Sequence, residues 1–131
     1  MNLQNLSKKN ILVIGASGQL GIEVSNLAAK NSDYVSLLRK GNWNQHTKGN
    51  AFKKLYSINF FTLSRRQIKK LVVNYDLIIY LAAVTTVQNS FSQEHSIYIK
   101  QVSALKSLLH SCVNTKKRII LPAHAQRMDP L

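Results

Sequence analysis

The feature that most constrains the fold is a run of four apolar residues, 11–14, that leads directly into Gly15, Gly18 and Gly21. After the last glycine, apolar side chains recur at helical intervals from Ile22 to Ala28. An apolar run, a glycine-rich turn and a helical pattern, in this order, predict a buried strand that turns sharply into a helix. We therefore expect exposed backbone at the first turn of that helix.

Such a turn suits the binding of a phosphate pair. The first turn of a helix offers N–H groups without intrahelical partners and the positive end of the helix dipole, and glycines let an anion approach the backbone. The spacing Gly-x-x-Gly-x-x-Gly differs from the general Gly-x-Gly-x-x-Gly fingerprint, so only the mechanism of that fingerprint applies. A turn that binds nothing is the alternative interpretation. The residues expected to hold the pyrophosphate of a dinucleotide are Gly15, Ser17, Gly18, Gln19, Leu20 and Gly21.

Strand and helix signals alternate along the rest of the chain. This alternation predicts an α/β fold with a parallel sheet that helices cover on both faces. The expected strands are residues 11–14, 34–38, 55–58, 76–83 and 119–121, and the expected helices are residues 19–30, a segment that begins near Thr62 or Ser64, and a segment that includes 98–112. Residues 41–50 indicate a loop or a weakly ordered helix. We predict a Rossmann-type doubly wound parallel sheet, truncated after about five strands.

Length and charge limit the possible functions. A chain of 131 residues predicts one domain. We expect a truncated dinucleotide-binding domain over residues 1–121 and an irregular tail over 122–131. Lys and Arg total 18 against 5 acidic residues, a formal net charge of +13 that attracts polyanions. The basic residues are scattered and accompany no nucleic-acid-binding motif, so specific nucleic-acid binding is not favoured.

Cysteine and histidine content exclude further classes of site. Cys112 is the single cysteine, which excludes an intrachain disulfide and fits a reducing, cytoplasmic location. The four histidines show no metal-ligand spacing, so no metal is expected. No apolar stretch approaches the length of a membrane span, so no membrane association is expected.

Several stretches resemble the extended short-chain dehydrogenases/reductases, in particular the NAD-dependent epimerase/dehydratase family that modifies nucleotide sugars. The resemblance covers residues 11–121. It depends on the glycine motif, the apolar run from Asp76 to Ala83, the helix from Tyr98 to Cys112 and the stretch 117–120. Residues 18–21 and 82–87 are also similar to the dTDP-4-dehydrorhamnose reductase branch of that superfamily. The resemblance implies a domain that binds NAD(P).

The same resemblance implies further contacts with the cofactor. Ser57 and Ile58 match the end of the third strand, which lies near the adenine in the family. Leu81, Ala82 and Ala83 match the strand end that borders the cofactor, where bulky side chains would block the dinucleotide. Ordinary core packing is the alternative explanation for the latter three.

The residue after the second expected strand bears on the choice of cofactor. Domains that bind NAD place an acidic residue there for the ribose hydroxyls, whereas an arginine accommodates the 2′-phosphate of NADP. Arg39 stands near this position with no carboxylate beside it. We therefore expect NADP or NAD to bind, with NADP favoured because a guanidinium pairs bidentately with phosphate. An exposed arginine without such a role is the alternative.

The catalytic residues of the family are not found in this sequence. Its enzymes use a Tyr-x-x-x-Lys pair, in which the lysine lowers the pKa of the phenol for proton transfer. None of the five tyrosines has a lysine four positions later, so no catalytic residue is assigned.

Three functions stay open. The first is a truncated nucleotide-sugar epimerase, dehydratase or reductase whose missing residues and sugar site another chain would supply. The second is a non-catalytic module for dinucleotide binding or partner docking, and the third, less favoured, is a basic nucleic-acid-associated protein. Self-association or a partner chain is expected in each case, because the last strand would leave an uncovered sheet edge.

Overall fold

The structure, a computed structural model, describes residues 8–16, 18–41, 43, 52–82 and 91–121. Its five strands form a parallel sheet in the order β3-β2-β1-β4-β5. The strands are β1 (Ile11–Ile14), β2 (Val35–Arg39), β3 (Lys54–Ser57), β4 (Leu77–Tyr80) and β5 (Arg118–Ile120). The helices are α1 (Gln19–Asn31), α3 (Arg65–Val72), α4 (Phe91–Cys112) and the short 3₁₀ helix η2 (Phe60–Thr62).

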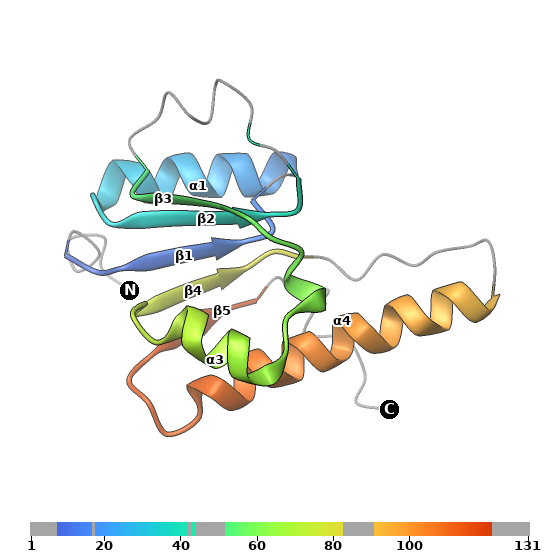
Figure 1. Cartoon of the computed structure of the whole chain (residues 1–131). Helices are drawn as coiled ribbons and strands as arrows, with labels where there is room; N and C mark the ends of the chain where they lie inside the picture. Colours follow the sequence, from blue (N-terminus) through green and yellow to red (C-terminus); the bar gives the residue numbers. More distant parts are fainter. Residues whose placement is uncertain (1–7, 17, 42, 44–51, 83–90, 122–131) are drawn as a thin grey trace.

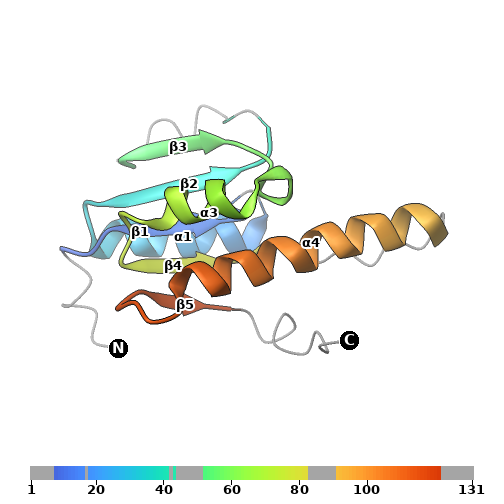
Figure 2. The same ribbon diagram turned by 60° about the horizontal axis from the view of Figure 1, so that its bottom comes forward.

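Helices cover both faces of this sheet. Helix α1 lies on one face, and α3 and α4 lie together on the other (Figure 1). Figure 2 shows the same separation from below, with α4 extending beyond the strands. The predicted α/β, Rossmann-type doubly wound sheet is confirmed.

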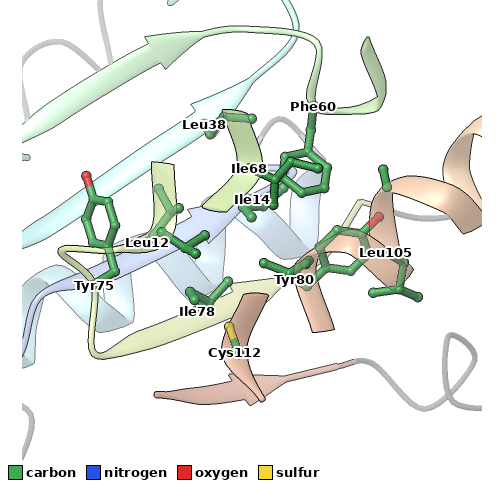
Figure 3. Packing of buried hydrophobic residues seen from close by; sticks show 13 residues of the cluster. Leu12, Ile14, Leu38, Phe60, Ile68, Tyr75, Ile78, Tyr80, Leu105 and Cys112 are labelled. Carbon is green, nitrogen blue, oxygen red and sulfur yellow. The ribbon is translucent and has the colours of Figure 1, made fainter. Parts of the chain in front are cut away.

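The buried strands supply side chains to two apolar clusters, because successive residues of a strand point to opposite faces. Leu12 and Ile14 of β1 pack in the cluster beneath α3 and α4, as Figure 3 shows. Ile11 and Val13 belong to the cluster on the α1 face. All four side chains have no exposed surface. The uninterrupted apolar run at 11–14 therefore results from burial on both faces.

The order of the strands fixes where a ligand can approach. Strand β1 pairs with β2 on one side and β4 on the other, so that Ile14 is level with both Leu38 and Tyr80. The chain passes from β1 through α1 to β2 and β3 on one side, and then returns through α3 to β4 on the other side of β1, so the strand order reverses here. In open α/β sheets, the carboxyl ends of strands around such a reversal form the crevice in which ligands bind.

Several boundaries differ from the sequence-based expectation. Strand β2 extends to Arg39, which pairs with Ser57 of β3, so the arginine belongs to the sheet. Strand β4 ends at Tyr80, and the backbone of Leu81 and Ala82 that follows it lies close against Gly15. Helix α4 begins at Phe91, earlier than the segment 98–112. The expected tail, residues 122–131, lies outside the described residues.

No helix in the described part of the chain is long and apolar enough to cross a membrane.

Candidate functional site

A cavity of about 590 Å³ opens at the carboxyl ends of β1, β2 and β4. The glycine turn forms one side of it, and this turn is fastened to β2 because the backbone N–H groups of Gly15 and Ala16 both donate to the Leu38 carbonyl oxygen, at 3.0 and 3.2 Å. The residues predicted from the sequence that line this cavity are Gly15, Gly18, Leu20, Gly21, Arg39, Ile58, Leu81 and Ala82.

Two of the three glycines are required by packing. Gly15 has φ +86°, a backbone conformation that residues with a Cβ rarely adopt, and a Cβ there would lie 2.5 Å from the backbone nitrogen of Ala82. A Cβ on Gly21 would lie 2.6 Å from the carbonyl oxygen of Gly15. These glycines let the end of β1, the start of α1 and the end of β4 approach one another closely.

Packing does not explain the third glycine. Gly18 is exposed, has an ordinary φ of −78°, and a Cβ added to it would meet no protein atom within 4 Å. It is also the N-cap of α1 and provides no side-chain acceptor to the N–H groups of the first helical turn. Unoccupied space and helix N–H groups therefore coincide at Gly18, which is the arrangement that an anion needs.

Arg39 lies at the β2 side of the cavity and stacks on Trp43. Its guanidinium carbon is 5.5 Å from the centre of the Trp43 ring, within the range of a cation–π contact. The indole N–H of Trp43 donates to the Tyr56 carbonyl oxygen at 3.2 Å, which attaches the tryptophan to β3. The guanidinium is thereby held beside the cavity.

The charged side chains around this cavity are all basic. Arg39, Lys40 and Lys100 line it, and its described lining includes no acidic residue. Lys40 follows β2, whereas Lys100 comes from α4 on the opposite side of the fold. Such a lining favours an anionic ligand.

Four predicted residues are not placed in the cavity. Gln19, the first residue of α1, and Ser57, the last of β3, are exposed and do not line it. Ser17 and Ala83 lie outside the described residues. Asn59, two residues after Ser57, does line the cavity. Its side-chain oxygen accepts a hydrogen bond from the Phe61 N–H at 3.1 Å.

The structure adds residues that sequence reasoning missed, and Gln101 is the most deeply buried polar one among them. Gln101 of α4 lines the cavity, is 5% exposed, and its side-chain oxygen has no hydrogen-bond partner in the protein. It lies on the helix face that buries Leu105, Leu108 and Cys112, at intervals of three or four residues. The sequence does contain a signal for this residue, because Gln101 is a polar residue on a helix face that is otherwise apolar.

The thiol and imidazole groups considered from the sequence do not form a reactive or metal-binding site among the described residues. Cys112 is buried, and burial raises the pKa of its thiol, which disfavours a reactive thiolate. His110 is exposed near the end of α4. Within the described ranges, no group of His, Cys, Asp and Glu could hold a metal ion.

Comparison with solved structures supports the fold. The structure is similar to Pal from Bacillus thuringiensis, with a TM-score of 0.70 and 21% identity, over 86% of this chain and 38% of that chain. It is similar to a uronate dehydrogenase from Agrobacterium tumefaciens, with a TM-score of 0.65 and 20% identity, over 86% of this chain and 40% of that chain.

A third similar structure is a UDP-N-acetylglucosamine 4-epimerase from Methanobrevibacter ruminantium. Its TM-score is 0.65 with 16% identity, over 85% of this chain and 36% of that chain. At these identities the likeness shows the fold alone. The chain spans about two fifths or less of the length of these three proteins.

Sequence comparison identifies the family. No curated protein shows a significant match to the chain. A family model does match, over residues 11–123, a range that contains the glycine turn and every described strand. The chain therefore belongs to the NAD dependent epimerase/dehydratase family.

Proposed function

We propose that the chain binds NAD(P) in the 590 Å³ cavity, with the pyrophosphate against the glycine turn and the first turn of α1. The observation that carries the proposal is Gly18. This glycine has no conformational or packing reason to lack a side chain, yet it opens onto the cavity beside helix N–H groups that have no side-chain cap. A ligand that must approach the backbone there explains the glycine.

The adenosine end of the cofactor belongs beside β2 and β3. Arg39 and Lys40 would contact the 2′-phosphate of NADP, and Ile58 and Asn59 would border the adenine. The absence of an acidic residue from the described lining removes the usual partner of the NAD ribose hydroxyls, which supports NADP over NAD. A uronate dehydrogenase from Agrobacterium tumefaciens is described in complex with NAD, so NAD serves as the comparison ligand.

The nicotinamide end belongs beside β4 and α4. Leu81 and Ala82 would border it, and the unpartnered amide oxygen of Gln101 would accept a hydrogen bond from it or from its ribose. The nicotinamide ring would supply hydride transfer when the cofactor is bound. Leu81, Ala82 and Gln101 would hold the ring and keep one side of it out of water.

For activity, we propose that the chain alone binds cofactor without turnover. The Tyr-x-x-x-Lys pair is not present in the sequence, so epimerase, dehydratase or reductase activity on a nucleotide sugar would need residues beyond these 131. A module whose function is cofactor binding or partner docking is the second candidate, and the same missing pair favours it. The cytoplasmic location and the self-association expected from the sequence stay predictions.

Thermal unfolding with and without dinucleotide tests the proposal. A ligand that binds only the native state at ~100 times its Kd stabilises it by about 2.7 kcal/mol, so NADPH should raise the Tm by several degrees. Gly18→Val should abolish this rise because the branched side chain fills the approach to the backbone. Its unliganded Tm should fall only by the modest cost of placing valine at a helix N-cap, since the added atoms meet no protein.

Ser103→Val serves as the control, because Ser103 is an exposed position of α4 that does not line the cavity. It should keep the full NADPH response. An equal rise in Tm for the wild type and Gly18→Val would exclude the site. The proposed lack of turnover would be contradicted by NADPH oxidation when the chain alone is mixed with UDP-sugars.

A further inference from the structure

Helix α4 reaches the cofactor cavity from the face of the sheet opposite to α1 (Figure 1). It extends beyond the strands, as Figure 2 shows, so that its middle lies level with the strand ends where the cavity opens. Two consecutive residues of this helix, Lys100 and Gln101, line the cavity together with Gly18, Leu20 and Gly21. A ligand that fills the cavity therefore meets both helices.

The side chain of Gln101 shows that α4 offers a buried polar group to such a ligand. Only 5% of this residue is exposed, and its amide oxygen has no hydrogen-bond partner in the described part of the chain. A buried acceptor that lacks a partner costs free energy, and a ligand with a donor removes that cost. The lining of the cavity by α4 is therefore suited to a polar ligand, and Lys100 is the next residue of that lining.

The positive charges around the cavity can be matched to the phosphates of the cofactor. Arg39 and Lys40 lie at the end of β2, where the 2′-phosphate of NADP is placed. The pyrophosphate carries a negative charge on each of its phosphates, but the first turn of α1 has no charged side chain. The helix terminus itself offers only about half an elementary charge. Lys100 is the cation that remains among the described lining residues.

We infer that Lys100 of α4 provides the counter-charge of the cofactor's pyrophosphate, across the cavity from the first turn of α1. The nicotinamide ribose joins the ring directly to the pyrophosphate. A helix that meets the nicotinamide end through Gln101 thus brings the preceding residue to the pyrophosphate. The inference rests on the proposed binding of NAD(P) and adds a residue of α4 to it.

The chemistry of lysine defines what this contact contributes. An ammonium on a flexible stem is a point charge without the planar, bidentate geometry of a guanidinium. Lys100 is exposed, so solvent weakens its attraction to an anion. It therefore adds affinity for the part that NADPH and NADH share, whereas Arg39 distinguishes the two cofactors.

Isothermal titration of the full chain with both cofactors tests the assignment. Lys100→Gln should weaken NADPH and NADH by a similar factor, about fivefold, because an exposed charge-assisted contact is lost. The ratio of the two affinities should change far less than in Arg39→Asp. Lys106→Gln is the matched control, at an exposed position of α4 that does not line the cavity, and should bind both cofactors nearly as the wild type does.

Two partial ligands locate the contact on the cofactor. Adenosine 5′-diphosphate contains the pyrophosphate and lacks the 2′-phosphate, while adenosine 2′-monophosphate has the reverse composition. In competition with NADPH, Lys100→Gln should weaken the diphosphate more than the 2′-monophosphate. Arg39→Asp should weaken the 2′-monophosphate more than the diphosphate. This crossed pattern is expected only if the two cations lie at different phosphates.

A conservative variant separates charge from structure. Lys100→Arg keeps the charge and should retain most of the affinity for NADPH. The unliganded Tm of both Lys100 variants should equal that of the wild type, because the side chain is exposed. A loss of affinity in Lys100→Arg as large as that in Lys100→Gln would show that the charge is not what binds, and would overturn the inference.

The remaining outcomes distinguish this inference from the proposed function. Wild-type binding of NADPH with an unchanged affinity in Lys100→Gln would overturn the inference alone. Equal losses in Lys100→Gln and Lys106→Gln, or equal losses for the two partial ligands in Lys100→Gln, would indicate diffuse attraction and would also overturn it. Absence of saturable NADPH binding by the wild type would refute the proposed function, and this inference with it.

Discussion

At the scale of single residues, the three glycines of the first turn are subject to different constraints. Gly15 and Gly21 are kept free of side chains by neighbouring backbone, while Gly18 faces open space. The sequence pattern predicted all three as phosphate contacts and could not separate these roles. The distinction depends on how close β4 and α1 come to the turn, which only the folded chain establishes.

Arg39 is the residue that should decide between the two dinucleotides. Replacing it by aspartate removes a phosphate partner from the end of β2 and introduces a charge that repels phosphate but accepts hydrogen bonds from ribose hydroxyls. Arg39→Asp should weaken NADPH binding about tenfold or more and improve the ratio of NADH to NADPH affinity, since charge-assisted hydrogen bonds contribute roughly 1.5–3 kcal/mol. Isothermal titration with both cofactors measures this ratio.

Arg66→Asp makes the same charge change at an exposed position of α3 outside the cofactor cavity. It should weaken the binding of both cofactors only slightly through the overall field, a little more for the more highly charged NADPH, and should change the affinity ratio far less than Arg39→Asp does. If Arg39→Asp leaves the affinity ratio where it was, the guanidinium has no part in cofactor choice.

The residues that sequence reasoning missed in the cofactor cavity share a physical cause. Asn59 precedes η2 and Gln101 lies in the middle of α4, so the two come from segments far apart in sequence and meet only through the crossing of the chain over the sheet. A motif read along the chain finds contiguous backbone, such as the glycine turn. It does not find side chains that converge from separate elements.

At the scale of elements, α3 shows how a short helix is defined at its start. Ser64 accepts a hydrogen bond from the Gln67 N–H at 3.1 Å, and the Gln67 side chain accepts one from the Ser64 N–H at 2.8 Å. This reciprocal capping box satisfies two donors that the first helical turn would leave unpaired. The sequence left Thr62 and Ser64 as alternative caps, and the structure selects Ser64.

Removal of this cap should destabilise the whole fold. Ser64→Ala should lower the free energy of unfolding by about 1 kcal/mol, the usual cost of losing a serine N-cap. Urea unfolding followed by circular dichroism measures the change. Ser103→Ala, at an exposed position inside α4, should be neutral or slightly stabilising because alanine has the higher helix propensity. Equal stability of the wild type and Ser64→Ala would show that the cap is dispensable.

The elements themselves were largely predictable from the sequence. Strands β1, β2 and β4 lie at largely apolar runs, and the burial of β1 and β4 on both faces explains why their runs are uninterrupted. Strand β3, Lys54–Ser57, has exposed polar residues at both ends. The end of β4 was not predictable, because it is set by the contact of Ala82 with Gly15, and these residues are distant in sequence. Most of the expected loop at 41–50 lies outside the described residues, so that expectation stays untested.

At the scale of the whole molecule, alkaline pH should unfold the protein through its buried tyrosines. Burial raises the pKa of Tyr75 to about 12 and raises that of Tyr80 further above its ordinary value of 10.0. In the unfolded chain both phenols ionise near pH 10, so above that pH the unfolded state binds fewer protons than the folded state. The stability that these groups confer is complete below about pH 10 and is lost as the pH rises toward their folded values.

Urea unfolding at a series of pH values from about 9 to 11 measures this loss, which should be steeper than for a protein whose tyrosines are exposed. Tyr80→Phe should flatten the decline because it removes one raised pKa together with a hydroxyl that has no partner. Tyr34→Phe, at a side chain that is 41% exposed, is the control and should keep the wild-type slope. Identical slopes for all three proteins would contradict the linkage.

The position of Trp43 gives the molecule an intrinsic optical reporter. It is the only tryptophan in the chain, and it stacks against the arginine that we assign to cofactor choice. Any anion that draws the guanidinium off the indole alters the surroundings of a single fluorophore. Emission from the unmodified protein can therefore follow the filling of the cofactor cavity.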